Sequence, residues 1–119
     1  MVRLLFRPSS QAVTRGDVWW VEFDPAVGSE INKTRPAVIV SNDIANQFLA
    51  RVVVVPLTSN VSRVYPGEAI VNVNDNKNKA MTDQIMSADK SRLKNKITTL
   101  SISDMVSIET AMKRFFGLA

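Results

Sequence analysis

The pattern of apolar and polar positions along the chain predicts several short β-strands. Runs rich in β-branched and aromatic residues, each bounded by Gly, Pro, Asn or Asp, are typical of strands. By this criterion we expect strands at 18–23, 36–40, 51–57, 68–73, 81–88 and 97–100. Long polar loops are expected at 26–34 and 58–67, and a turn at 74–79. Pro36 donates no ladder hydrogen bond, so we expect it at the start of its strand or at a sheet edge.

Two segments show helix signals instead. Ser41–Asp43 suits a helix N-cap, which predicts a short helix through Phe48. Near the end of the chain, Ser101 suits a second N-cap and Gly117 a stop. One face of that helix is expected to carry Met105, Ile108, Met112 and Phe115. An apolar face of this kind is typical of core or dimer packing rather than of a cofactor site.

Together these elements predict a mostly β fold with a C-terminal α-helix, built as a small barrel or as two packed sheets. The 119 residues suit one domain. Residues 1–14 show no sustained periodicity and are interpreted as an N-terminal extension, with the folded domain at 15–119. No apolar run approaches the roughly 20 residues that cross a bilayer. We therefore expect a cytoplasmic protein without a membrane partner.

The composition excludes several kinds of catalytic site. The chain contains no Cys and no His, which excludes disulfides, thiol nucleophiles, histidine bases and the usual zinc sites. Its Asp and Glu residues are scattered without metal-ligand spacing, so neither a metal nor another cofactor is expected. Proton transfers in such an enzyme must use carboxylates, hydroxyls, Lys, Arg or groups of the substrate.

The net charge of +4 is unevenly distributed. The tail carries Arg3, Arg7 and Arg15 and no acid, so the rest of the chain is nearly neutral. The segment Lys77–Lys96 is rich in Lys and Arg, a pattern that suits phosphate groups. A solvated basic surface explains the same pattern equally well.

Polar residues at strand ends are the candidates for chemistry. Arg35 precedes an apolar strand, and its guanidinium fork suits a phosphate; a salt bridge to Glu30 is the alternative. The hydroxyl of Thr58 suits a phosphate, or a turn formed with residues 59–60. Asp83–Gln84 lies within a predicted strand, where Asp is disfavoured. That position indicates a functional site or a solvent-facing edge.

Five blocks of sequence, in order, resemble the MazF/PemK (Kid) toxins. They are Arg15–Val21 with Asp24–Pro25 and Gly28–Glu30, then Arg35–Asn42, Val55–Ser59, Asp83–Ile85 and Asp89–Leu93. The resemblance runs from Arg15 to about Leu118. It implies a small SH3-like β-barrel, usually a homodimer, that cleaves single-stranded RNA and is neutralised by a cognate antitoxin.

The resemblance also implies roles for individual residues. The positions of Arg35 and Thr58 are those tied to cleavage in the family, and those of Ser29, Glu30, Asp83 and Gln84 line the RNA groove. We add Lys33 as a phosphate contact. Trp19 and Trp20 are expected on opposite faces of one strand, with at least one in the core.

The chemistry that this implies needs no enzyme nucleophile. The RNA 2′-hydroxyl attacks the adjacent phosphate and leaves 2′,3′-cyclic phosphate and 5′-hydroxyl ends. Arg35 would stabilise charge on the phosphoryl oxygens and help to protonate the leaving oxygen, while Thr58 holds the phosphate. Glu30 is the candidate base. Two alternatives remain: a CcdB-like toxin that binds gyrase through its C-terminal helix, and a binding barrel for RNA or protein without catalysis.

Overall fold

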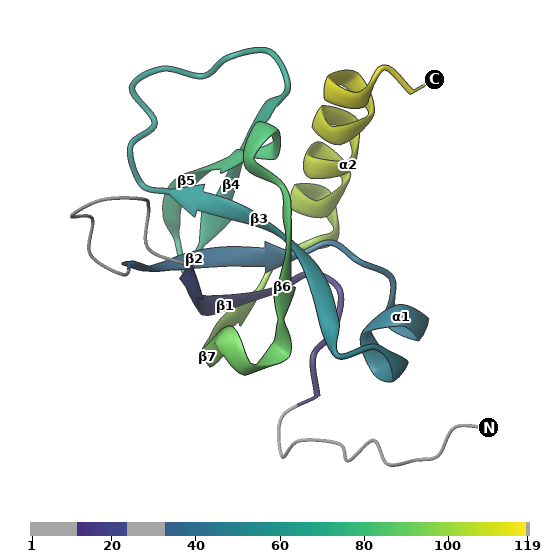
Figure 1. The fold of residues 1–119 in the computed structure, drawn as a ribbon. Coiled ribbons are helices and arrows are strands. Elements are labelled where there is room, and N and C mark those ends of the chain that lie inside the picture. Colours follow the sequence, from purple (N-terminus) through teal and green to yellow (C-terminus); the bar gives the residue numbers. More distant parts are fainter. Residues whose placement is uncertain (1–11, 24–32, 119) are drawn as a thin grey trace, which may run out of the picture.

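Antiparallel pairing joins the strands into one sheet, as the computed structural model of the chain shows (Figure 1). The structure describes residues 12–23 and 33–118. The strands are β1 (Asp17–Phe23), β2 (Lys33–Ile39), β3 (Arg51–Thr58), β4 (Glu68–Val73), β5 (Asn76–Met81), β6 (Met86–Asp89) and β7 (Leu93–Thr99). Helix α1 (Asp43–Phe48) precedes β3, and α2 (Ile102–Phe116) ends the fold.

Strand β3 lies at the centre of the sheet. The strand order is β4-β5-β3-β2-β1-β7, and β6 also pairs with β3. One edge of β3 pairs with β2, and the other pairs first with β6 and then with β5. The order leaves β4 and β7 at its two ends, so the sheet is open. The prediction of a mostly β fold with a C-terminal helix is confirmed.

Helix α2 covers one face of the sheet. Met105, Ile108 and Ala111 are buried in a core cluster with residues of β1 to β5. Ser101 accepts a hydrogen bond from the Asp104 backbone N–H at 3.0 Å, and the helix ends at Gly117 with a φ of 72°. Both predicted caps are therefore confirmed. Phe115 departs from the predicted core face, since its side chain is half exposed.

A second core cluster lies on the other face of the sheet. It comprises Trp19, Val21, Ala37, Ile39, Val52, Val54 and Ala88. Trp19 is buried there, whereas its neighbour Trp20 is exposed, because successive strand residues face opposite sides. The prediction that at least one of the two is a core residue is confirmed.

The prediction of a continuous strand at 81–88 is wrong. The 3₁₀ turn η1 (Thr82–Gln84) separates β5 from β6, and both strands follow the same edge of β3. The Thr82 hydroxyl, buried in this turn, donates to the carbonyl of Gly67. That tertiary hydrogen bond fixes the turn that separates β5 from β6. Asp83 and Gln84 therefore lie in a turn, where Asp is favoured, rather than within a strand.

The predicted turn at 74–79 is also too long. Only Asn74 and Asp75 turn the chain, with φ of 49° and 69°, which matches a two-residue hairpin. The polar residues after them form β5 because β4 and β3 flank them on both sides. β2 likewise begins before Pro36, which lies within this inner strand and not at its start or at an edge. Pairing of β2 with β3 begins only at Ala37, so the missing Pro36 N–H interrupts no ladder bond to β3 there.

Candidate functional site

Arg35 lies near the start of β2 and Thr58 at the end of β3, both beyond the last paired residues of these two strands. That last pair is Ala37 with Pro56, and Arg35 and Thr58 each lie two residues beyond it. Both side chains are half-buried. A guanidinium and a hydroxyl thus come from the unpaired ends of two adjacent strands, although they are distant in sequence.

Both side chains lie on the face of the sheet opposite α2. Arg35 pairs with Val21, a residue of the second core cluster, and Thr58 pairs with Lys79. Directly opposed residues in an antiparallel pair share a face. The neighbouring pair, Leu57 with Ala80, belongs to the cluster beneath α2. Arg35 and Thr58 therefore lie on the face that carries the second core cluster, away from the cluster beneath α2.

The hydroxyl of Thr58 takes part in a turn and keeps a donor. The Asn60 backbone N–H donates to its Oγ1 at 3.2 Å, as the turn interpretation predicts. This bond uses one acceptor position of the hydroxyl, whose O–H remains a donor. The turn therefore orients Thr58 and is compatible with a hydrogen bond to a phosphate oxygen.

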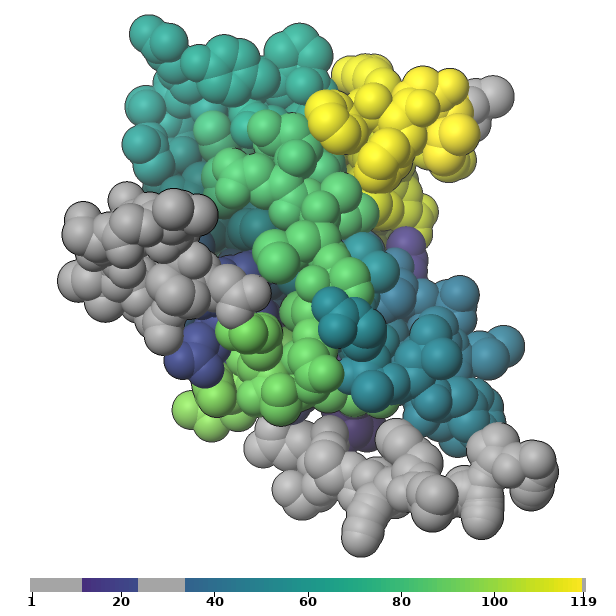
Figure 2. Space-filling view, in the orientation of Figure 1, coloured from purple at the N-terminus to yellow at the C-terminus, as the bar shows by residue number. Residues whose placement is uncertain are grey.

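Asp83 and Gln84 are exposed on η1, close to the Thr58 end of β3. Their turn lies between Ala80, which pairs with Leu57, and Met86, which pairs with Val54. Figure 2 shows the green segment that contains η1 and β6 running across the middle of one face of the molecule. The structure thus brings two of the predicted groove residues to the same region as Thr58.

Several cations of the segment Lys77–Lys96 are already paired with carboxylates. Lys79 lies 3.3 Å from Glu68, Lys94 3.3 Å from Glu22, and Lys96 3.3 Å from Asp17. Burial lowers the pKa of Lys90, whose ammonium donates to the backbone carbonyl of Asn46. The segment is spread over β5, β6 and β7, so it does not form one basic patch.

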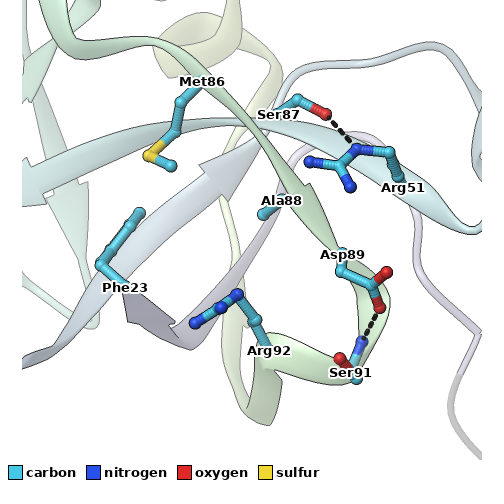
Figure 3. A pocket seen from close by; sticks show the side chains of 8 residues that line it. All are labelled: Phe23, Arg51, Met86, Ser87, Ala88, Asp89, Ser91 and Arg92. Carbon is cyan, nitrogen blue, oxygen red and sulfur yellow. Dashed lines mark hydrogen bonds between the residues drawn. The ribbon is translucent and has the colours of Figure 1, made fainter. Parts of the chain in front are cut away.

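A cavity of about 370 Å³ lies beside β6 (Figure 3). Its lining residues are Phe23, Arg51, Met86, Ser87, Ala88, Asp89, Ser91 and Arg92. Phe23 follows Val21 by two positions on β1 and therefore shares the face of Arg35. The cavity combines an aromatic ring and a thioether with two guanidinium groups.

Hydrogen bonds to nearby groups orient the charged side chains that line this cavity. Arg51 Nε donates to Ser87 Oγ at 2.9 Å, and Arg92 donates to the Glu22 carbonyl at 3.2 Å. The Ser91 backbone N–H, 2.9 Å from Asp89 Oδ1, holds the pKa of Asp89 below its usual value. Two guanidinium groups and one carboxylate therefore line the cavity. Sequence patterns gave no signal for it, because Arg51 and Asp89 meet only through strand pairing.

Other predicted site residues are placed differently or not at all. Ser29 and Glu30 lie outside the described residues, so the predicted alternative salt bridge from Arg35 to Glu30 does too. Lys33 begins β2 opposite Phe23, but only its backbone is described. Trp20 is exposed on the face opposite Arg35, which argues against a stacking role beside that residue.

Among residues 12–23 and 33–118, no group of three or more Asp or Glu side chains is arranged to hold a metal ion. Within the same ranges, no helix combines the length and the apolar character that a membrane span requires.

Comparison with known proteins identifies the family. Residues 14–116 match the family described as "PemK-like, MazF-like toxin of type II toxin-antitoxin system". The chain is 39% identical over 113 residues to Endoribonuclease MazF9 of Mycobacterium tuberculosis, covering 87% of this chain and 96% of the relative. It is 32% identical over 111 residues to Endoribonuclease MazF of Staphylococcus epidermidis, covering 89% and 92%. The chain therefore belongs to the PemK-like, MazF-like toxin family.

Solved structures agree with this assignment. A mycobacterial endoribonuclease in complex with its cognate antitoxin superposes with a TM-score of 0.71 at 27% identity, covering 91% of this chain and 96% of that one. The predicted family membership is confirmed, and the predicted endoribonuclease activity agrees with the names of both curated relatives.

Proposed function

We propose that this chain is a toxin that cleaves single-stranded RNA without a metal ion. The observation that carries the proposal is that Arg35 and Thr58, from adjacent strands, both lie on the sheet face opposite α2. The names of the curated relatives support an RNA substrate. The absence of His and Cys supports a mechanism in which the substrate supplies the nucleophile.

In this mechanism the 2′-oxygen attacks phosphorus and the bond from phosphorus to the 5′-oxygen breaks. Arg35 donates hydrogen bonds to the phosphoryl oxygens and passes a guanidinium proton to the leaving 5′-oxygen as the bond breaks; solvent then returns a proton to the guanidine. Thr58 donates its O–H to a phosphoryl oxygen and keeps the phosphate in line. The 2′-hydroxyl proton passes to a carboxylate, for which Glu30 is our candidate.

The first test is to incubate the chain with a long single-stranded RNA in excess EDTA. We expect discrete cuts that leave 2′,3′-cyclic phosphate and 5′-hydroxyl ends, detected by mapping cut sites and end groups. Ends with a 5′-phosphate, or cleavage that EDTA abolishes, would contradict the mechanism. A folded, antitoxin-free chain that leaves RNA intact would favour the gyrase-binding or pure binding alternatives.

We further propose that RNA extends from Arg35 into the cavity beside β6. The cavity contains two guanidinium groups, and its Phe23, Met86 and Ala88 share the face of Arg35. Arg51 alternates to the other side of β3 and lines the cavity from the far side of β6. Unpaired bases stack on aromatic rings and guanidinium planes, and phosphates pair with Arg. Asp83 and Gln84, at the edge between these two regions, would contact base edges.

Arg51→Gln is expected to weaken RNA binding and to lower the slope of log affinity against log salt by about 1, because one phosphate contact is lost. The measurement is binding of labelled 2′-fluoro RNA, which lacks the nucleophile, over a range of salt concentrations. Arg114→Gln, on α2 and so away from this face, is the matched control. Equal slopes for the two variants would contradict a phosphate contact at Arg51.

An antitoxin is the second partner that we propose, since a solved relative is bound to its cognate antitoxin. An acidic or extended segment that covers the Arg35 face would block RNA and so neutralise the toxin.

We also propose a homodimer, to which exposed apolar side chains such as Ile44 and Phe48 would contribute.

A further inference from the structure

The loop between β3 and β4 presents an exposed aromatic ring on a fixed backbone. Tyr65 is the one tyrosine of the chain, and its side chain is 54% exposed. Its backbone N–H donates to Glu68 Oε1 at 2.7 Å, and its carbonyl accepts from the Glu68 N–H at 3.0 Å. Pro66 follows and restricts the chain further. The ring is therefore exposed, but its attachment is anchored.

A nearly buried ion pair, Lys79 with Glu68, packs against one face of this ring. Lys79 Nζ lies 5.7 Å from the centroid of the Tyr65 ring, 3.3 Å from Glu68 Oε1 and 2.8 Å from the Arg63 carbonyl that it donates to. The side chains of Lys79 and Glu68 are only 11% and 10% exposed. A cation over an aromatic face is attractive, so it favours one ring orientation. These bonds leave Lys79 poorly available to a substrate phosphate.

Strand pairing sets this assembly beside the proposed site of cleavage. Lys79 is directly opposite Thr58, so the two side chains share the sheet face opposite α2. Arg35 flanks Thr58 on the other side. The Tyr65 ring, 5.7 Å from Lys79 Nζ, is thus linked through one residue to the strand end that carries Thr58.

The edge of the ring also carries a positive charge. Arg63 Nη1 donates to the Tyr65 hydroxyl at 3.3 Å, and both side chains are exposed. Proteins that bind single-stranded nucleic acids often combine an aromatic face with a nearby guanidinium. Bases stack on the ring, and the phosphate backbone lies near the cation.

We propose that Tyr65 is a stacking platform for an unpaired RNA base next to the scissile phosphate, and that Lys79 and Glu68 are the residues that position it. This inference rests on the proposed function. Lys79 acts through the ring and does not touch the phosphate. Stacking of one base on an aromatic side chain changes affinity by roughly 5- to 150-fold.

Tyr65→Leu tests the proposal, since leucine keeps an apolar side chain and removes the π face. The probe is a 2′-fluoro RNA oligonucleotide containing 2-aminopurine, whose fluorescence is quenched when it stacks. We expect about tenfold weaker binding and loss of quenching in Tyr65→Leu. Tyr65→Phe, which keeps the ring, should bind within about twofold of the unaltered chain. Val64→Ala, an exposed apolar neighbour, is the matched control.

The outcomes separate this inference from the proposed function. If Tyr65→Leu binds and quenches like the unaltered chain while RNA is still cut, the stacking role is wrong and cleavage stands. If binding and quenching depend on Tyr65 but RNA is never cut, stacking stands and catalysis is wrong. An unaltered chain that does not bind the probe contradicts both.

Glu68→Gln tests the positioning role. Glutamine retains an acceptor for the Tyr65 N–H but loses the charge that pairs with Lys79. We expect a higher KM with kcat nearly unchanged, together with weaker 2-aminopurine quenching, and partial recovery of quenching in Glu68→Asp. A fall in kcat at constant KM and constant quenching would overturn it.

Discussion

Replacing Arg35 with alanine is expected to slow RNA cleavage by about 10²–10³-fold without unfolding the chain. Loss of one well-oriented donor to the charge that develops in a transition state typically has this effect. Arg35 is half-buried on the face opposite α2, on the strand next to that of Thr58. Its side chain contributes to the site rather than to either core cluster. Single-turnover cleavage of a short RNA, at saturating enzyme, measures the rate.

Two variants make this result interpretable. Arg35→Lys keeps the charge but loses the planar fork, so a rate between those of the unaltered chain and Arg35→Ala is expected. Arg114→Ala removes an exposed guanidinium from α2 and should leave cleavage unchanged. Near-normal cleavage by Arg35→Ala would remove Arg35 from the mechanism. If toxicity in cells depends on Arg114 and not on Arg35, the gyrase-binding alternative becomes the better one.

Ile108→Ala is expected to lower the free energy of unfolding by about 2–5 kcal/mol, because it leaves a cavity in a packed core. The Ile108 side chain is 0% exposed and belongs to the cluster that joins α2 to the sheet, Leu57 included. Alanine is the better helix former, but by less than about 0.7 kcal/mol, which does not offset the loss. Chemical denaturation at one fixed protein concentration measures the change.

Ile102→Ala in the same helix is the matched control, since that side chain is 85% exposed. A change within about 0.5 kcal/mol is expected there. Equal losses for the two variants would mean that contacts beyond this fold, such as those of a dimer, bury Ile102 as well. A small loss at Ile108 would contradict the packing of α2 on the sheet.

Local sequence signals were sufficient for most elements of the fold. Helix α2 follows from apolar periodicity between Ser101 and Gly117, and both caps are present in the structure. Strands β1, β3 and β4 follow from β-branched and aromatic runs bounded by turn residues. These signals succeed because caps, turns and periodicity act between residues that are close in sequence.

The same signals failed where neighbours in space override local preference. Asn76–Met81 has the polar composition of a turn, yet it is a strand because β3 and β4 both pair with it. The break at η1 depends on Thr82 and the Gly67 carbonyl, which are far apart in sequence. Pairing with distant strands supplies hydrogen bonds that no local pattern reveals.

Local patterns predicted most of the helices and strands, and the order of the motifs predicted the family. The same motifs matched Arg35 and Thr58 to positions that are tied to cleavage in that family. They did not specify which side chains meet. The basic segment Lys77–Lys96 suited phosphate groups or a solvated surface, but the register of β5 buries Lys79 of that segment against Glu68 and beside the Tyr65 ring. Strand register and order depend on hydrogen bonds between remote segments and on which face the core covers. These contacts between remote segments bring the candidate site residues together, and they form only when the chain folds.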